Sequence, residues 1–97
     1  MKFLLYRAKK RSKYNAVFIE YIDGYKVTKV VQFGSINYEN FTEHGDISKR
    51  NAMIKRLEKF ELNNPYNKKT LSYYIAYGPN KNIYENMRLF KLKFNFE

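Results

Sequence analysis

Cysteine is absent from this chain of 97 residues, so neither a disulfide nor a thiolate metal site can form. Histidine is almost absent too, because His44 is the only one, and a single histidine cannot supply the usual set of metal ligands. No internal repeat and no low-complexity linker interrupts the sequence. We therefore expect one domain, residues 1–97, that is held together by packing and needs no metal or cofactor.

Long hydrophobic runs are also missing. No apolar stretch approaches the ~20 residues that a membrane-spanning helix requires. Residues 1–5 are apolar in part, but this segment is too short for the core of a signal peptide. The sequence therefore predicts an intracellular protein that is neither secreted nor inserted in a membrane.

Acidic residues are scarce relative to basic ones. Nineteen Lys and Arg stand against nine Asp and Glu, which gives a net charge of +10. Such an excess favours an anionic partner, either nucleic acid or an acidic protein. Aromatic residues are abundant, with ten Tyr and eight Phe but no Trp. Tyrosine suits half-buried faces and interfaces, because its ring packs while its hydroxyl stays hydrated.

The first third of the chain predicts an antiparallel meander. Residues 2–6, 15–22 and 26–33 are rich in β-branched and aromatic residues. Asp23-Gly24 separates the last two segments, and this dipeptide fits a tight hairpin turn that needs positive φ.

The middle of the chain predicts helices. Asp46 is a suitable N-cap, and apolar residues at helical spacing follow it, so we expect an amphipathic helix over residues 47–62. A breaker segment, NNPYNKK, comes next, and residues 70–77 predict a short second helix. Its tyrosines, Tyr73, Tyr74 and Tyr77, could stack on unpaired bases, although packing in the core explains them as well.

The last ten residues, RLFKLKFNFE, alternate strictly between apolar and polar side chains. Phe90, Leu92, Phe94 and Phe96 share one parity, which predicts a strand with one buried face. A helix that begins near Asn80 is the alternative. The expected fold is α+β: a small antiparallel sheet, consisting of the meander and the C-terminal strand, with one main helix and a short second helix on one face.

Two clusters of basic residues are candidates for phosphate contacts. The first lies in the segment RAKKRSK, between the first two strands, and the second occupies the polar side of the main helix. Together they predict a nucleic-acid-binding surface that acts through counterion release. A solvated surface without a ligand is the alternative for the first cluster. The candidate residues are Arg7, Lys9, Lys10, Arg11, Lys13, Lys49, Lys55, Arg56 and Lys59.

The segment GSINYENFTEHGDISKR, residues 34–50, resembles a catalytic constellation at first sight. His44 lies near carboxylates, but no cysteine is present and no serine has a nucleophile's surroundings, so we expect no catalytic residue. The alternative is a loop that bonds to itself. Arg50 falls inside the apolar arc of the predicted helix and therefore needs partners. The predicted structural tie consists of Arg50 with Asp46 and with Glu39 or Glu43, and His44 is expected to hydrogen-bond nearby.

The motifs FGSINYENFTEHGDISKR, NNP and LSYYIAYG resemble those of a small uncharacterised family from giant nucleocytoplasmic DNA viruses. Members carry Phe-Gly, then Tyr-x-Asp-Tyr-Thr-x-His-x-Asp, a basic helix, and later Ser-Arg-Trp-Leu-Leu-Trp. The matching residues are Phe33, Gly34, Tyr38, Thr42, His44, Asp46, Arg56, Asn64, Ser72 and Gly78. The departures are Asn40, Phe41, Tyr73, Tyr74 and Tyr77, which replace the family's Asp, Tyr, Arg and two Trp. The resemblance covers residues 30–83 and implies viral origin without implying any activity.

These features together predict a non-enzymatic basic viral protein. It would bind DNA or RNA without sequence preference, or pack inside the virion as a structural component. The alternative is a protein-interaction module, either a minor capsid or cement protein or an effector that binds an acidic host protein. The expected location is the virion and the viral factory in the host cytoplasm.

Overall fold

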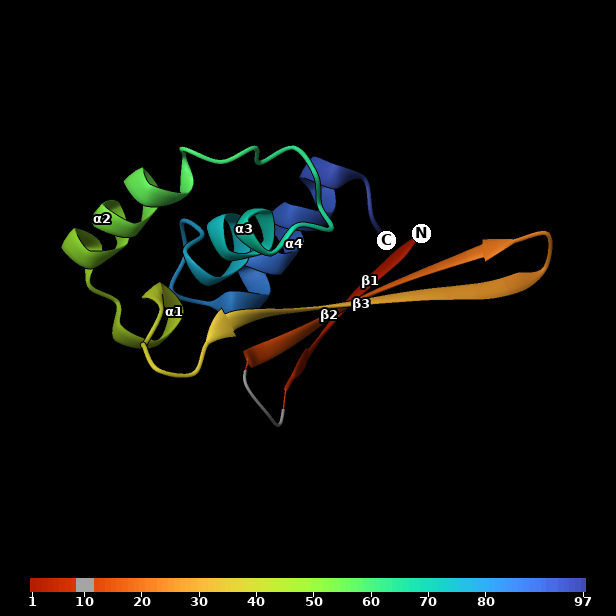
Figure 1. Ribbon diagram of the computed structural model, residues 1–97, viewed down its shortest axis with the longest axis horizontal. Helices are drawn as coiled ribbons and strands as arrows, with labels where there is room; N and C mark the ends of the chain where they lie inside the picture. The colour runs from red at the N-terminus through yellow and green to blue at the C-terminus, as the bar shows by residue number, and fades with distance from the viewer. Residues whose placement is uncertain (9–11) are drawn as a thin grey trace.

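A three-stranded antiparallel sheet with helices on one side forms the architecture of the computed structural model, which describes residues 1–8 and 12–97 (Figure 1). The strand order is β1-β2-β3. The elements are β1 (Lys2–Arg7), β2 (Ser12–Ile22), β3 (Tyr25–Ser35), α1 (Phe41–His44), α2 (Ile47–Leu57), α3 (Lys68–Leu71), the π-helix η1 (Ser72–Ala76) and α4 (Ile83–Phe94). The predicted α+β class and the antiparallel meander are confirmed.

The predicted hairpin turn is also confirmed. Ile22 faces Tyr25 across the turn, and the two residues between them, Asp23 and Gly24, have φ values of 51° and 82°. Two positive φ angles in a two-residue loop match the twist of the flanking strands, and glycine adopts such an angle without strain.

The core lies between the sheet and the helices α3, η1 and α4. Its largest side chains are almost fully buried, at 0–2% exposure: Phe3, Phe18, Phe33, Leu71, Ile75 and Phe90. The aromatic rings contact one another directly, because Phe3 lies 4.8 Å from Phe90 and 5.2 Å from Phe18 between ring centroids. Most of the phenylalanines therefore lie in the core or against it, whereas most tyrosines lie at its margin or outside it.

Helix α2 begins where the sequence predicted and ends five residues early, at Leu57 rather than residue 62. The side chain of Asp46 caps its N-terminus by accepting the backbone N–H groups of Ser48 and Lys49, at 2.9 and 3.2 Å. The prediction extended the helix to residue 62 because Phe60 continues the apolar spacing. Phe60 is 50% exposed, however, so it does not belong to a buried helix face. Its ring instead lies under the ammonium of Lys69, at 4.6 Å.

The second helical segment is confirmed near residues 70–77, but it begins earlier and changes type. Asn67 caps α3 by accepting the N–H of Lys69 at 2.8 Å, and the chain then widens into η1. Leu71 and Ile75 are fully buried, as the inward face required, and Tyr74 and Tyr77 are partly buried.

The predicted C-terminal strand is wrong, because residues 83–94 form helix α4. The alternative, a helix that begins near Asn80, is confirmed. Alternation at Phe90 and Phe94 satisfies the helical i, i+4 spacing equally well, and Ile83 and Met87 continue the same helical face upstream. Leu92, which shares the parity of Phe90, is 67% exposed. Asn82 supplies the N-cap and Asn95 ends the helix at φ 64°. Helix α4 also packs against the sheet, because its Phe90 contacts Phe3 of β1.

The β2–β3 hairpin reaches well beyond the helices (Figure 1). The molecule measures 47 × 27 × 23 Å along its principal axes, and the hairpin lies along the longest of them. Residues 20–30 are all exposed, so the sheet is a packed layer at one end and an uncovered ribbon at the other.

Candidate nucleic-acid interface

The segment between β3 and α2 bonds to itself and to the sheet through Asn40. This side chain is 4% exposed, and its amide donates to the hydroxyl of Tyr14 at 3.2 Å. Its oxygen accepts the N–H of Thr42 at 3.0 Å, while the N–H of Asn40 donates to Glu43 at 3.0 Å. This reciprocal capping box fixes α1 against β2. The loop therefore bonds to itself and to β2 through Asn40, a residue that the predicted tie did not include.

Lys13, one of the predicted phosphate contacts, bonds to this loop in the structure. Its ammonium forms an ion pair with Glu43 and also donates to the carbonyl oxygen of Tyr38. Its side chain is only 16% exposed. Burial alone would raise the pKa of the Glu43 carboxyl, but the Lys13 hydrogen bond, the Asn40 N–H and the charges of Lys13 and Arg7 outweigh it, so the pKa is lowered.

Arg50 does not contact the carboxylates that the sequence analysis assigned to it. Its Nε donates to the carbonyl oxygens of Tyr77 and Gly78, at 3.0 and 3.1 Å, and its guanidinium lies 5.5 Å from the centre of the Phe41 ring. The predicted tie of Arg50 to Asp46, Glu39 or Glu43 is thus wrong. The carbonyl groups at the end of η1 lack helical partners, and a guanidinium satisfies them from the side.

The other members of the predicted tie hold the loop in separate ways. Asp46 caps α2, and its own N–H donates to Nδ1 of His44 at 2.8 Å, as the hydrogen-bonding role of His44 required. Glu43 pairs with Lys13, whereas Glu39 lies exposed on the loop.

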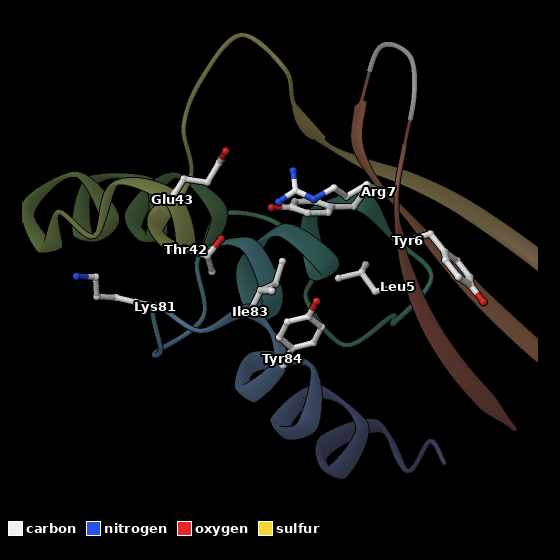
Figure 2. A pocket seen from close by; sticks show the side chains of 9 residues that line it. Leu5, Tyr6, Arg7, Thr42, Glu43, Lys81, Ile83 and Tyr84 are labelled. Atoms are coloured by element: carbon white, nitrogen blue, oxygen red, sulfur yellow. The ribbon is translucent and has the colours of Figure 1, made fainter.

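The first of two hollows beside α1 has a volume of about 420 Å³ and opens between β1, α1 and the start of α4 (Figure 2). Figure 2 shows Arg7 at the upper right of the hollow and Glu43 at its upper left, with Lys81 at the left and its ammonium directed away from Arg7; Leu5, Ile83 and Tyr84 lie below Arg7. The ring of Tyr84 is 75% exposed. We call this hollow the Arg7 pocket; it combines two cations, exposed aromatic rings and an apolar wall.

The second hollow has a volume of about 340 Å³ and lies on the other side of α1, between α2, α3 and the end of β3. Lys68 and Lys69 line it together with Tyr38, whose ring is 71% exposed, and Met53 contributes to its apolar wall. No Asp or Glu is among its lining residues in the described part of the chain. We call this hollow the Lys69 pocket. The hydrogen bond between Asn40 and Tyr14 lies between the two pockets, because each residue lines one of them.

The predicted basic residues other than Lys13 divide into four groups. Arg7 lines a pocket, and Lys49 and Arg56 flank Met53 on the surface of α2, at the i−4 and i+3 positions. Lys55 and Lys59 line neither of the two pockets. Lys9, Lys10 and Arg11 lie outside the described residues.

Sequence reasoning missed three cations that line the pockets: Lys68, Lys69 and Lys81. The pair Lys68-Lys69 was visible next to the breaker segment, but nothing in the sequence placed it opposite α2. Lys81 is isolated in the sequence; in the structure its side chain lies against Gly45 and lines the Arg7 pocket.

Two further findings bear on the chemistry available. Within residues 1–8 and 12–97, no group of three or more His, Asp or Glu side chains is arranged to hold a metal ion. None of the helices in the same part of the chain is long and apolar enough to span a membrane.

Comparison with known proteins gives one match. No curated protein and no solved structure is similar to the chain at a significant level. A family model, described as "Family of unknown function (DUF5754)", matches residues 5–57, which contain the second half of β1, all of β2 and β3, α1 and α2. Because this match spans more than half of the chain, the protein belongs to that family of unknown function, DUF5754.

Proposed function

We propose that this protein binds nucleic acid without sequence preference, through phosphate contacts at the Arg7 and Lys69 pockets. One observation carries the proposal: four cations line the two pockets, Arg7, Lys81, Lys68 and Lys69, against a single carboxylate, Glu43. That carboxylate already forms an ion pair with Lys13. The pockets therefore keep an excess of positive charge that faces solvent.

The exposed tyrosines favour single-stranded nucleic acid as the ligand. The Arg7 pocket combines two cations with two exposed rings, Tyr6 and Tyr84, and the Lys69 pocket combines two cations with the exposed ring of Tyr38. Proteins that bind single strands without sequence preference pair a basic groove with aromatic rings on which bases stack. A duplex keeps its bases stacked internally and would use the lysines alone.

The main helix extends the positive surface beyond the Lys69 pocket. Lys49 and Arg56 lie on the same side of α2 as Met53, which lines that pocket, so a phosphate backbone leaving the pocket meets further cations. Arg7 begins the RAKKRSK segment, so the backbone on the Arg7 side lies close in sequence to Lys9, Lys10 and Arg11.

The resemblance of residues 30–83 to the giant-virus motifs supports a viral setting for this activity. For a viral protein, binding of this kind fits a component that accompanies the genome in the viral factory or in the virion. Virion proteomics would test that setting separately from the binding itself.

A salt titration with matched variants tests the binding. The double variant Lys68→Ala, Lys69→Ala should bind a random single-stranded oligonucleotide more weakly, and the slope of log K against log salt should fall by about 0.7 for each lost phosphate contact. The control, Lys55→Ala with Lys59→Ala, removes the same charge from outside both pockets and should change the slope less. Equal effects of the two variants would mean diffuse attraction to the whole surface, and no measurable binding at low salt would refute the function.

A further inference from the structure

The end of the β2–β3 hairpin exposes large apolar side chains, although Lys29 at its base lies 4.8 Å from the centre of the Tyr66 ring. We define the arm as residues 20–30, all of which are exposed. Five of its side chains are large and apolar, with exposures of 47–76%: Tyr21, Ile22, Tyr25, Val27 and Val30. Side chains alternate between the two faces of a strand, so Tyr21 and Val30 lie on one face and Ile22, Tyr25 and Val27 on the other. Both faces of the arm therefore carry exposed apolar side chains, and on the second face Val27 borders a hollow that Met1 and Tyr66 also line.

The arm also exposes unpaired backbone groups along the outer edge of β3. Within the described residues, β3 pairs only with β2. The opposite edge of the sheet, β1, is partly paired with the C-terminal residue. Glu97 N–H donates to the Met1 carbonyl at 2.9 Å, and Phe3 N–H donates to the Glu97 carbonyl at 3.3 Å. An isolated two-stranded ribbon is only marginally stable in water, so a further strand would stabilise the arm.

The geometry of the turn decides which backbone groups of β3 point outward. In a two-residue hairpin, the pair that flanks the turn, here Ile22 and Tyr25, exchanges both hydrogen bonds, and every second pair does the same. Val27 and Lys29 therefore bond to β2, whereas the backbone groups of Lys26, Thr28 and Val30 face the open edge. A partner strand would meet these three residues.

The charge of the arm differs from that of the rest of the chain and bears on which partner the arm can bind. The whole chain carries +10, but the arm contains Glu20, Asp23, Lys26 and Lys29, whose charges sum to zero. A second copy of this chain would be repelled at the basic pockets and not at the arm. The arm's neutral charge and exposed apolar side chains are equally unsuited to a phosphate backbone.

We propose that two copies of this chain associate through their arms, with the outer edges of β3 paired antiparallel about a two-fold axis at Thr28. In this register Thr28 faces Thr28 of the second copy, and Lys26 faces its Val30. The interface is isologous, so each such contact occurs twice. No two lysines stand directly opposite each other, and the two sheets become one continuous six-stranded sheet.

The register provides a charge test that affects folding equally in both variants. Val30→Lys places a lysine opposite Lys26 of the second copy at two positions, whereas Val30→Glu creates an attractive pair at the same positions. Sedimentation of the nucleic-acid-free protein over a concentration series should give a dimer of 11.8 kDa chains for the parent and for Val30→Glu. Val30→Lys should raise the dissociation constant roughly tenfold or more relative to Val30→Glu. A monomeric parent at all concentrations, or equal dissociation constants for the two variants, overturns the proposal.

A second pair of variants tests the edge itself. Proline at position 28 removes an N–H that faces the open edge and leaves the ladder to β2 intact, as proline does on edge strands. Thr28→Pro should therefore be monomeric with an unchanged circular dichroism spectrum, whereas Thr28→Val should remain dimeric. A folded Thr28→Pro protein that still dimerises overturns the proposed pairing.

Discussion

The Nε of Arg50 lies 3.0 Å from the carbonyl oxygen of Tyr77, so a side chain from α2 closes the end of the π-helix η1. The same nitrogen reaches Gly78 at 3.1 Å. The buried and partly buried side of α2 consists of Arg50, Met53, Ile54 and Leu57, and the Arg50 contact connects α2 to the end of η1. The orientation of both the Lys69 pocket and the basic side of α2 therefore depends on Arg50.

Substitution of Arg50 should destabilise the protein. Arg50→Ala removes a charged donor and leaves the carbonyls of Tyr77 and Gly78 without it, which costs about 1.5–3 kcal/mol in the free energy of unfolding. Arg50→Lys should recover only part, because an ammonium on a flexible chain lacks the planar geometry of guanidinium. Urea denaturation measures both. Lys49→Ala is the matched control, and a loss as large as that of Arg50→Ala would contradict the account.

The turn after η1 should tolerate no side chain at position 78. Gly78 is buried, and a methyl group there would overlap the carbonyl oxygen of Tyr74 and the amide of Asn86. Asn86 is fully buried and holds the turn by donating to the carbonyls of Ile75 and Asn80, at 3.0 and 2.8 Å. Gly78→Ala should therefore lower stability by about 1–3 kcal/mol.

A comparison with Asn86 completes this test. Asn86→Ala leaves the backbone carbonyls of Ile75 and Asn80 without their side-chain donor. It should therefore lower the melting temperature by an amount similar to Gly78→Ala. Asn80→Ala serves as the control, because the Asn86 bonds to residue 80 involve only its backbone. An unchanged melting temperature for Gly78→Ala would show that the turn can open without cost.

The ion pair between Lys13 and Glu43 should give the protein an acid-sensitive contact. Folding lowers the pKa of Glu43 below its ordinary value of 4.5, so the stabilisation is present above that pH and is lost as the pH falls through the lowered pKa. The contribution is below about 1 kcal/mol, because the pair is partly open to solvent. Melting temperatures of Glu43→Gln and the parent should differ at pH 7 and converge in acid. Glu39→Gln, on the same loop, should follow the parent throughout.

Truncation of the tail should prevent stable folding even though the tail is a helix and not a strand. Removal of residues 89–97 deletes Phe90, which is 1% exposed, and Phe96, whose ring lies 5.3 Å from Phe18 and 5.8 Å from Phe90. Each buried aromatic contributes on the order of 1.5–3 kcal/mol. Leu92→Ala, at an exposed position of the same helix, should have little effect on the melting temperature. A truncated chain that melts with the parent would contradict the core described above.

The sequence predicted those elements whose signals are local. Asp23-Gly24 determined the hairpin and Asp46 the start of α2, because turn and cap geometry depend on adjacent residues. The tail was mistaken because Phe90 and Phe94 satisfy both strand and helix periods. Which period holds depends on Asn82 as a cap and on packing against Phe3.

Side-chain partners far apart in sequence were beyond prediction. Arg50 was correctly identified as a partly buried charge that needs partners, but backbone carbonyls 27 and 28 residues away satisfy it rather than nearby carboxylates. The arrangement of Lys68 and Lys69 across from α2 likewise depends on tertiary packing. Composition gave the sign of the charge and not its location.

The central claim is that nucleic acid binds at the two pockets beside α1, and an NMR titration tests it most directly. A ¹⁵N-labelled protein is titrated with a random single-stranded oligonucleotide at low salt, and the backbone amide shifts are mapped onto the chain. The account predicts the largest shift changes around Tyr38, Lys69, Lys81 and Tyr84, and little change in the arm and at the end of α4. Shift changes confined to other surfaces, or none at all, would contradict it.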